Sequence, residues 1–153
     1  MNYIRIDDVA ALVADLVNPV LVLLLLAAPW VPKKPGEGPV QFWVSSATAI
    51  VLATLIAEAG KNFSVWPGHD TFPSGHESFG AAAGICLAGY DRDWLWFVVP
   101  LLALFGWALV TAGYHDPPDI AGAIVVGLAC ALLARYVVRS IHHRLRSAGG
   151  NQN

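Results

Sequence analysis

Long apolar stretches separated by short polar breaks dominate the chain. Five such stretches occur, at about residues 9–31, 40–60, 77–90, 94–113 and 119–138. A helix needs about 20 mostly apolar residues to cross the hydrocarbon core of a bilayer. Only the stretch 77–90 is clearly shorter, and it reaches spanning length if residues 74–76 form the first turn of its helix. The pattern therefore predicts an all-α integral membrane protein, a bundle of about five transmembrane helices.

The composition narrows the class of protein further. Of the 153 residues, 56% are hydrophobic and 13% are charged, whereas about a quarter of the residues in a soluble domain are charged. This length suits a single membrane domain over residues 1–153. The formal net charge of −2 argues against a nucleic-acid partner. Cys86 and Cys130 fall inside apolar stretches, where we expect small buried side chains.

Basic residues are distributed unevenly between the two sides of the predicted bundle. Five spans place the chain ends on opposite sides, and the N-terminal side holds two basic residues, Arg5 and Lys61. The other side holds seven basic residues: Lys33, Lys34, Arg92, Arg135, Arg139, Arg144 and Arg146. Because basic loops tend to face the cytoplasm, we expect a cytoplasmic C-terminal tail over residues 139–153. In a bacterium this predicts the inner (cell) membrane, with the opposite loops facing the periplasm or the exterior.

Two polar clusters interrupt the apolar pattern on this outer side. They are Pro73-Ser74-Gly75-His76, where the third stretch begins, and His115-Asp116-Pro117-Pro118-Asp119, just before the fifth. Ionisable groups near a bilayer core are costly, which makes them candidates for function. The segment before the first cluster adds Lys61 and His69. Together these side chains predict a hydrolytic site that faces water.

The spacing within each cluster indicates its chemistry. His115 and Asp119 are four residues apart and so share one face of a helix. A carboxylate there can hold one imidazole nitrogen and leave the other free to attack a substrate or to ligate a metal. The plainer interpretation is a helix-capping aspartate beside an interfacial histidine. In the other cluster, Ser74 is a good N-cap, Gly75 allows close approach of an anion to the helix start, and His76 can donate a proton.

The clusters also resemble the motifs of a known family. Phe72-Pro73-Ser74-Gly75-His76 and Gly113-Tyr114-His115-Asp116-Pro117-Pro118-Asp119 resemble the second and third signature motifs of the type 2 phosphatidic acid phosphatases (PAP2, lipid phosphate phosphatases). The resemblance extends over about residues 61–127. It implies a PAP2-like core that hydrolyses a lipid phosphomonoester or diphosphate at the outer membrane face. It further implies a phosphohistidine intermediate, with no metal and no other cofactor.

The resemblance assigns roles to single residues. It implies that His115 is the nucleophile, that Asp119 orients it, and that His76 protonates the leaving oxygen. The positions that match phosphate-holding residues of the family are Lys61, Ser74 and Gly75. Lys61 resembles the lysine of the first motif, which binds phosphate.

The chain departs from the family pattern at both arginines. Gly68 and His69 stand where the first motif has Arg-Pro, and Ala108 and Leu109 stand where the third has Ser-Arg. A phosphate site without these arginines lacks bidentate, charge-assisted contacts. Protonated His69 and Arg5 are the candidates for supplying that charge.

Two other functions stay open on the sequence alone. The missing arginines favour a catalytically degenerate PAP2-like protein that binds a lipid phosphate or has a scaffold role. The neighbouring carboxylates Asp70, Glu77 and Asp116 favour a metal-dependent membrane hydrolase, in which a divalent cation supplies the positive charge. In each case the expected partners are a lipid phosphate or diphosphate and the membrane lipids, and a homo-oligomer is left open.

Overall fold

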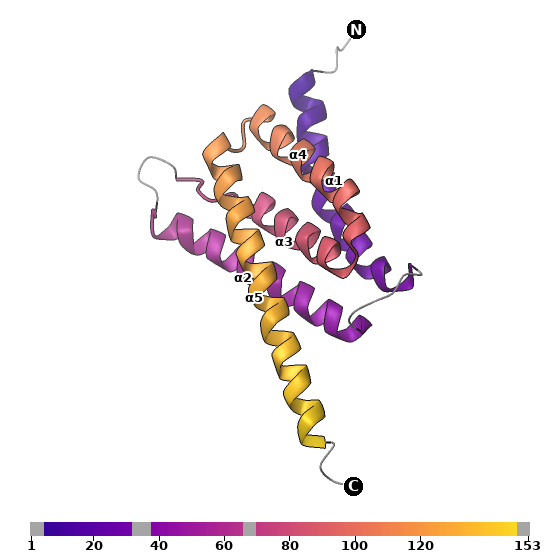
Figure 1. Cartoon of the computed structure of the whole chain (residues 1–153). Helices are drawn as coiled ribbons and strands as arrows, with labels where there is room; N and C mark the ends of the chain where they lie inside the picture. The colour runs from indigo at the N-terminus through magenta and orange to yellow at the C-terminus, as the bar shows by residue number, and fades with distance from the viewer. Residues whose placement is uncertain (1–4, 32–37, 66–69, 150–153) are drawn as a thin grey trace.

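The chain folds as a bundle of helices (Figure 1). The computed structural model describes residues 5–31, 38–65 and 70–149, and no strand occurs within them. Its helices are α1 (Ile6–Ala27), α2 (Pro39–Asn62), α3 (Gly75–Tyr90), α4 (Leu95–Thr111) and α5 (Pro117–Gly149), with short 3₁₀ turns η1 (Ala28–Trp30) and η2 (Arg92–Trp94). The all-α prediction is therefore confirmed.

Helix α3 lies at the centre and packs against α1, α2, α4 and α5 (Figure 1). Its stretch of small residues permits this position, because a Cβ added at Gly127 of α5 would lie 2.6 Å from Cβ of Ala81. On the α4 side, a Cβ added at Gly80 would lie 3.0 Å from the ring of Phe105. Small residues let helix backbones approach closely, which is how helices pack well inside a membrane.

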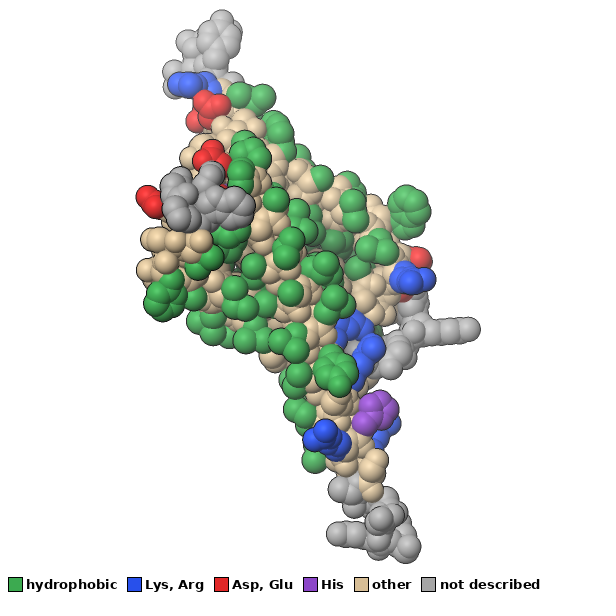
Figure 2. All heavy atoms as spheres, turned by 60° about the vertical axis from the view of Figure 1, so that its left-hand side comes forward, with side chains coloured by type: hydrophobic (Ala, Val, Ile, Leu, Met, Phe, Trp, Pro, Cys, Tyr) green, Lys and Arg blue, Asp and Glu red, His purple; other side chains and the backbone are tan. Residues whose placement is uncertain are grey.

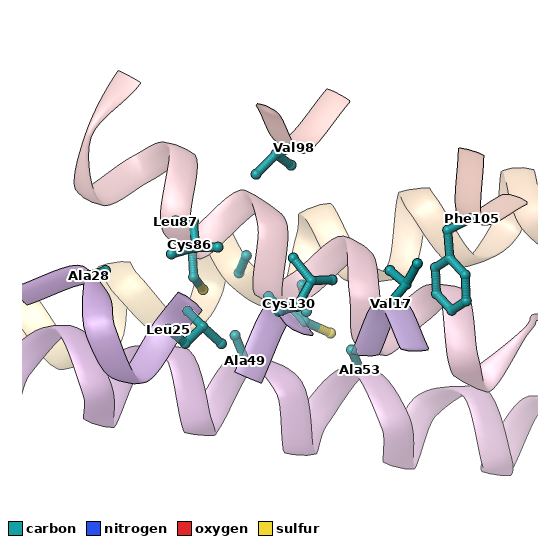
Figure 3. Packing of buried hydrophobic residues seen from close by; sticks show 14 of the residues in the cluster. Val17, Leu25, Ala28, Ala49, Ala53, Cys86, Leu87, Val98, Phe105 and Cys130 are labelled. Atoms are coloured by element: carbon teal, nitrogen blue, oxygen red, sulfur yellow. The ribbon is translucent and has the colours of Figure 1, made fainter. Parts of the chain in front are cut away.

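The core below the polar end is apolar (Figure 3). Val17 and Leu25 of α1 and Ala53 of α2 pack in it with residues of α3 and α5. Cys86 and Cys130 are free and buried, as expected from the sequence. Large hydrophobic side chains also cover the visible outer face of the helices, as a lipid-facing surface requires (Figure 2).

Four helical segments are long and apolar enough to cross a membrane, within the described part of the chain. They contain α1, α2, α4 and α5, whereas α3 has 16 residues. At 1.5 Å per residue, α3 is about 24 Å long and falls short of a hydrocarbon core of about 30 Å. The third predicted span, at residues 77–90, is thus a helix, but a short one enclosed by the others. Residue 74 lies just outside it as the N-cap.

Both ends of α3 are tied to other elements. At its C-terminal end, the Arg135 guanidinium of α5 donates to the carbonyl oxygens of Cys86 (3.3 Å) and Gly89 (2.7 Å). A basic side chain suits the last carbonyls of a helix, where the helix dipole is negative. Arg135 therefore stabilises the end of the bundle opposite the polar clusters. At that polar end, α2 ends, α3 begins, and α4 turns into α5 (Figure 1).

Candidate active site

The end of α2 packs closely against the loop that precedes α3. A Cβ added at Gly60 would lie 2.7 Å from Cδ of Pro73 and 3.3 Å from the carbonyl oxygen of Phe72. Only a residue without a side chain fits this approach. The contact brings the next residue, Lys61, to the start of α3, where its Nζ lies 3.4 Å from the Cβ position of Gly75.

The first turn of α3 presents unused backbone donors. Ser74 is the N-cap, and its Oγ accepts a hydrogen bond from the Glu77 N–H at 3.2 Å. Its carbonyl oxygen accepts from the Ser78 N–H at 2.9 Å. Within the described residues, the N–H groups of Gly75 and His76 have no such partner. Free N–H groups and the helix dipole make this turn a suitable anion site.

The turn between α4 and α5 is set by Gly113, whose φ is +73°. Its N–H donates to the carbonyl oxygen of Val110 at 3.0 Å, and the Tyr114 N–H donates to that of Leu109 at 3.0 Å. This pair of bonds is a Schellman motif, and glycine suits its left-handed residue. The motif ends α4 and directs the following residue, His115, toward the start of α5.

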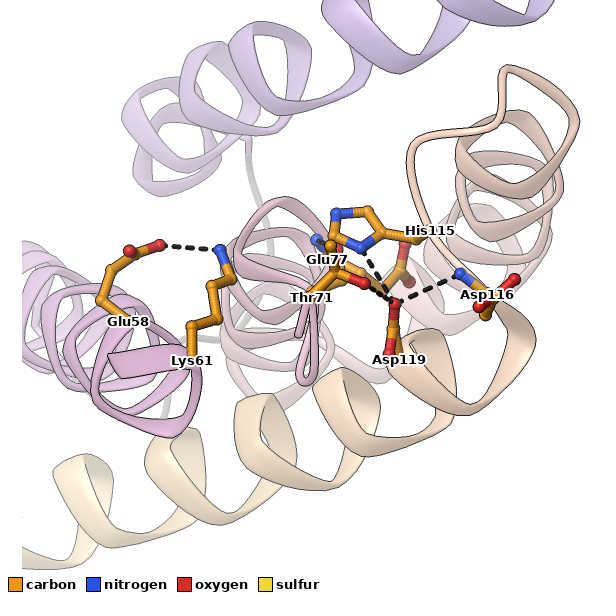
Figure 4. Close-up of polar contacts among 8 residues, drawn as sticks. Glu58, Lys61, Thr71, Glu77, His115, Asp116 and Asp119 are labelled. Carbon is orange, nitrogen blue, oxygen red and sulfur yellow. Dashed lines mark hydrogen bonds and ion pairs between the residues drawn. The ribbon is translucent and has the colours of Figure 1, made fainter. Parts of the chain in front are cut away.

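Asp119 holds His115 in place (Figure 4). Nδ1 of His115 lies 3.3 Å from Oδ2 of Asp119. Their side chains are 8% and 0% exposed. Because a carboxylate only accepts, Nδ1 carries the proton in this contact. The other ring nitrogen, Nε2, is then the one with a free lone pair.

The same carboxylate oxygen accepts two further hydrogen bonds. Oδ2 of Asp119 lies 2.5 Å from the donating hydroxyl of Thr71 and 3.2 Å from the N–H of Asp116 (Figure 4). The backbone adds a bond from the Ser74 N–H to the Asp119 carbonyl oxygen at 3.2 Å. Oδ1 of Asp119 is buried with no partner among the described residues. Asp119 therefore links the second motif to the third through hydrogen bonds.

His76 faces the same space as His115. The centres of the two rings are 6.5 Å apart, and their planes are inclined by 57°. The amide of Asn18, on α1, donates to the carbonyl oxygen of His76 at 3.1 Å. The first helix thereby holds the backbone of His76, the residue that lies opposite His115.

Burial controls the protonation of His115. It lowers the pKa of His115 below its usual value, and the charges of Lys61 and His76 act in the same direction. The hydrogen bond and the negative charge of Asp119 raise that pKa, but they do not outweigh burial. The imidazole is therefore neutral, with a free Nε2, at neutral pH.

The structure brings most of the predicted site residues together at one end of the bundle: Lys61, Ser74, Gly75, His76, His115 and Asp119. His69 lies outside the described residues. The guanidinium of Arg5 pairs with Asp7 at 3.0 Å where α1 begins. Among the residues described, no group of three or more His, Cys, Asp or Glu side chains is arranged to hold a metal ion.

The two positions that match the Ser-Arg of the third motif lie in the core. Ala108 is 0% exposed and Leu109 is 1% exposed, and both belong to the buried apolar cluster. This end of α4 therefore contributes the backbone turn to the site and no positive charge.

Two residues of the site were not identified from the sequence: Asn18 and Thr71. Asn18 is a polar interruption in an apolar stretch, and Thr71 lies two residues before the second motif. A polar residue at an apolar position is a usable signal for Asn18. A threonine in a loop carries no comparable signal.

We predict that His115 titrates below the usual histidine value of about 6.5, because burial favours its neutral form. Nitrogen-15 NMR of histidine-labelled protein in detergent micelles measures this, and His115→Gln assigns the resonance. Asp119→Asn removes the interactions that raise the pKa, so the titration should move further toward acid. A midpoint at or above 6.5 in the unmodified protein would contradict the prediction.

We predict that Thr71→Val destabilises the protein by about 1–3 kcal/mol, because the buried Asp119 carboxylate loses a hydrogen-bond donor. Thr71→Ser keeps the hydroxyl and should recover most of that stability. Thermal unfolding followed by tryptophan fluorescence compares the two variants. Equal melting temperatures for the valine and serine variants would show that the hydroxyl contributes nothing.

Comparison with known proteins agrees with the motifs. A family model described as "PAP2 superfamily" matches residues 29–142. The "Putative undecaprenyl-diphosphatase YbjG" of Escherichia coli (strain K12) is 26% identical over 92 residues, which cover 60% of this chain and 46% of the relative. The chain thus spans about half the length of that relative. No solved structure matches the chain significantly. Since the family model covers most of the sequence, the chain belongs to the PAP2 superfamily.

Proposed function

We propose that the protein is a membrane phosphatase that hydrolyses a lipid phosphomonoester or diphosphate at the outer membrane face, through a phosphohistidine intermediate. The observation that carries this proposal is the pair His115–Asp119, held at 3.3 Å opposite His76 and beside the start of α3. In this proposal His115 is the nucleophile, Asp119 orients it, His76 is the acid, and the start of α3 is the anion site.

The first half of the reaction transfers the phosphoryl group to the protein. Nε2 of His115 attacks phosphorus, the bond from phosphorus to the lipid oxygen breaks, and protonated His76 gives its proton to that oxygen. The proton on Nδ1 stays on His115 and faces Asp119, whose negative charge stabilises the phosphorylated imidazolium. Lys61 and the backbone N–H groups at Gly75 hold the phosphate oxygens.

The second half returns the protein to its starting state. His76, now neutral, takes a proton from a water molecule as the water oxygen attacks phosphorus. The bond from phosphorus to Nε2 breaks, its electron pair returns to His115, and inorganic phosphate leaves. His76 is again protonated for the next turnover.

An apolar groove beside the site supports a lipid substrate. It has a volume of about 570 Å³ and lies between α4 and α5, and Pro117, two residues after His115, is one of its lining residues. Its other lining residues include Leu102, Trp107 and Ile124. A hydrocarbon tail in this groove would place its phosphate near the histidines. The name of the Escherichia coli relative supports a diphosphate as one form of that substrate.

A second function has one observation in its favour. Ala108 and Leu109 are buried in the core, so α4 provides no arginine for the phosphate. A protein with this site would bind a lipid phosphate weakly and would turn it over slowly or not at all. Phosphate release from a panel of lipid phosphates by the purified protein tests this second function. Release would show hydrolysis, whereas binding of the same lipids without release would support a binding protein.

We predict that His115→Ala lowers phosphate release on the order of 10³-fold or more, because the covalent route requires the nucleophile. His142→Ala is the matched control, since this histidine lies near the other end of α5, and its activity should be unchanged. Radioactive lipid phosphate should leave an acid-labile, base-stable label on the unmodified protein. If the His115→Ala variant kept near-full activity, or carried the same radioactive label, His115 would be excluded as the nucleophile.

We predict that the site end of the bundle faces outward and the C-terminal end of α5 faces the cytoplasm. The reason is the excess of basic residues along the end of α5, visible where this helix extends beyond the others in Figure 2. An impermeant maleimide on intact cells should label Asn2→Cys, and should label Ser147→Cys only after permeabilisation. Cys86 and Cys130 are 1% and 3% exposed and should stay unlabelled. Labelling of both introduced cysteines from one side would overturn this orientation.

A further inference from the structure

Lys61 already has an anionic partner. Its Nζ lies 2.9 Å from Oε1 of Glu58, one helical turn earlier on α2 (Figure 4). Both atoms lie over the first residue of α3, because a Cβ added at Gly75 would be 3.4 Å from Lys61 Nζ and 3.3 Å from Glu58 Oε1. The close packing at Gly60 sets this arrangement, since it brings the end of α2 against the loop before α3.

The Glu58 carboxylate stands where a phosphate oxygen would be held. It contacts the ammonium group and lies beside the N-terminal turn of α3, which are the two features that attract an anion there. The Glu58 side chain is 54% exposed and that of Lys61 is 28% exposed. Glu58 can therefore turn away into water without disturbing the core, whereas Lys61 has less freedom.

The charges of the two side chains cancel. A phosphate that binds here must displace the Glu58 carboxylate from the Lys61 ammonium group. The bound phosphate then lies close to the negative charge of that carboxylate. A phosphomonoester or diphosphate carries up to two or more negative charges and can win this exchange. A phosphodiester carries one negative charge, has fewer free oxygens and competes less well.

We infer that Glu58 is an internal competitor that occupies Lys61 in the empty site and lowers the affinity of that site for phosphate groups. This inference rests on the proposed function for its substrate class. The binding of a free anion, however, tests it without any turnover. Glu58 acts through Lys61 and through its own charge, and takes no part in bond making or breaking.

The test measures the binding of two small probes to the purified full chain in detergent by isothermal titration calorimetry. The probes are inorganic phosphate, which is strongly anionic, and dimethyl phosphate, a monoanionic diester. Glu58→Gln should bind inorganic phosphate about tenfold more tightly than the unmodified protein, because the competing charge is gone. Dimethyl phosphate should gain by no more than the same factor, because displacing the carboxylate costs the same for both probes and the carboxylate repels the singly charged probe less.

Asp7→Asn is the matched control. Asp7 is also an exposed carboxylate paired with a basic side chain, Arg5, at 3.0 Å, and its pair lies where α1 begins. Its loss changes the net charge by the same amount and should leave both affinities unchanged. Glu58→Gln should have a smaller effect when Lys61→Gln is already present, because only the repulsion by the carboxylate is then removed.

Two other binding outcomes overturn the inference. Weaker phosphate binding by Glu58→Gln would mean that Glu58 positions Lys61 and does not compete for its charge. Equal binding by the variant and the unmodified protein, including no binding by either, would mean that the pair lies outside the anion site. Tighter phosphate binding without any phosphohistidine would uphold Glu58 as a competitor and overturn the proposed hydrolysis, so the two failures are distinguishable.

Discussion

The buried carboxylate of Asp119 ties together the chain segments that form the site. Its side chain accepts hydrogen bonds from Thr71, His115 and the N–H of Asp116, and its carbonyl oxygen accepts one from the N–H of Ser74. A buried carboxylate is costly unless such donors surround it. The requirement to satisfy it therefore fixes the loop before α3, the turn after α4 and the ring of His115 at the same time.

Packing in the membrane makes this convergence possible. Lipid supplies little hydrophobic driving force between helices, so close backbone approach has to hold the bundle together. Gly80 and Gly127 allow α3 to lie within van der Waals contact of α4 and α5, and Gly60 allows α2 to meet the loop before α3. The first turn of α3 is consequently surrounded by the ends of three other helices. A longer or bulkier central helix would separate them.

The sequence was sufficient to predict much of this arrangement, because its signals are local. Apolar length predicts α1, α2, α4 and α5, and the spacing of His115 and Asp119 predicts their contact. Contacts between distant segments have no such local pattern. Thr71 meets Asp119 across 48 positions, and the approach of Glu58 to Gly75 depends on how α2 packs. The full burial of Glu77 at the first turn of α3 was equally hidden, since an acidic residue there ordinarily favours solvent.

Leu109 is buried at the end of α4, so this helix places no basic side chain at the site. Because α4 ends in an apolar core and a glycine turn, it orients His115 and offers no cation. Within the described residues, the charge at the start of α3 comes from Lys61 and from backbone N–H groups. Such groups bind an anion through fixed dipoles, which cost no side-chain ordering when the phosphate arrives. Under the proposed function, the affinity for phosphate would therefore depend on the contact between α2 and the loop before α3 at Gly60, a packing feature, as well as on the number of basic residues.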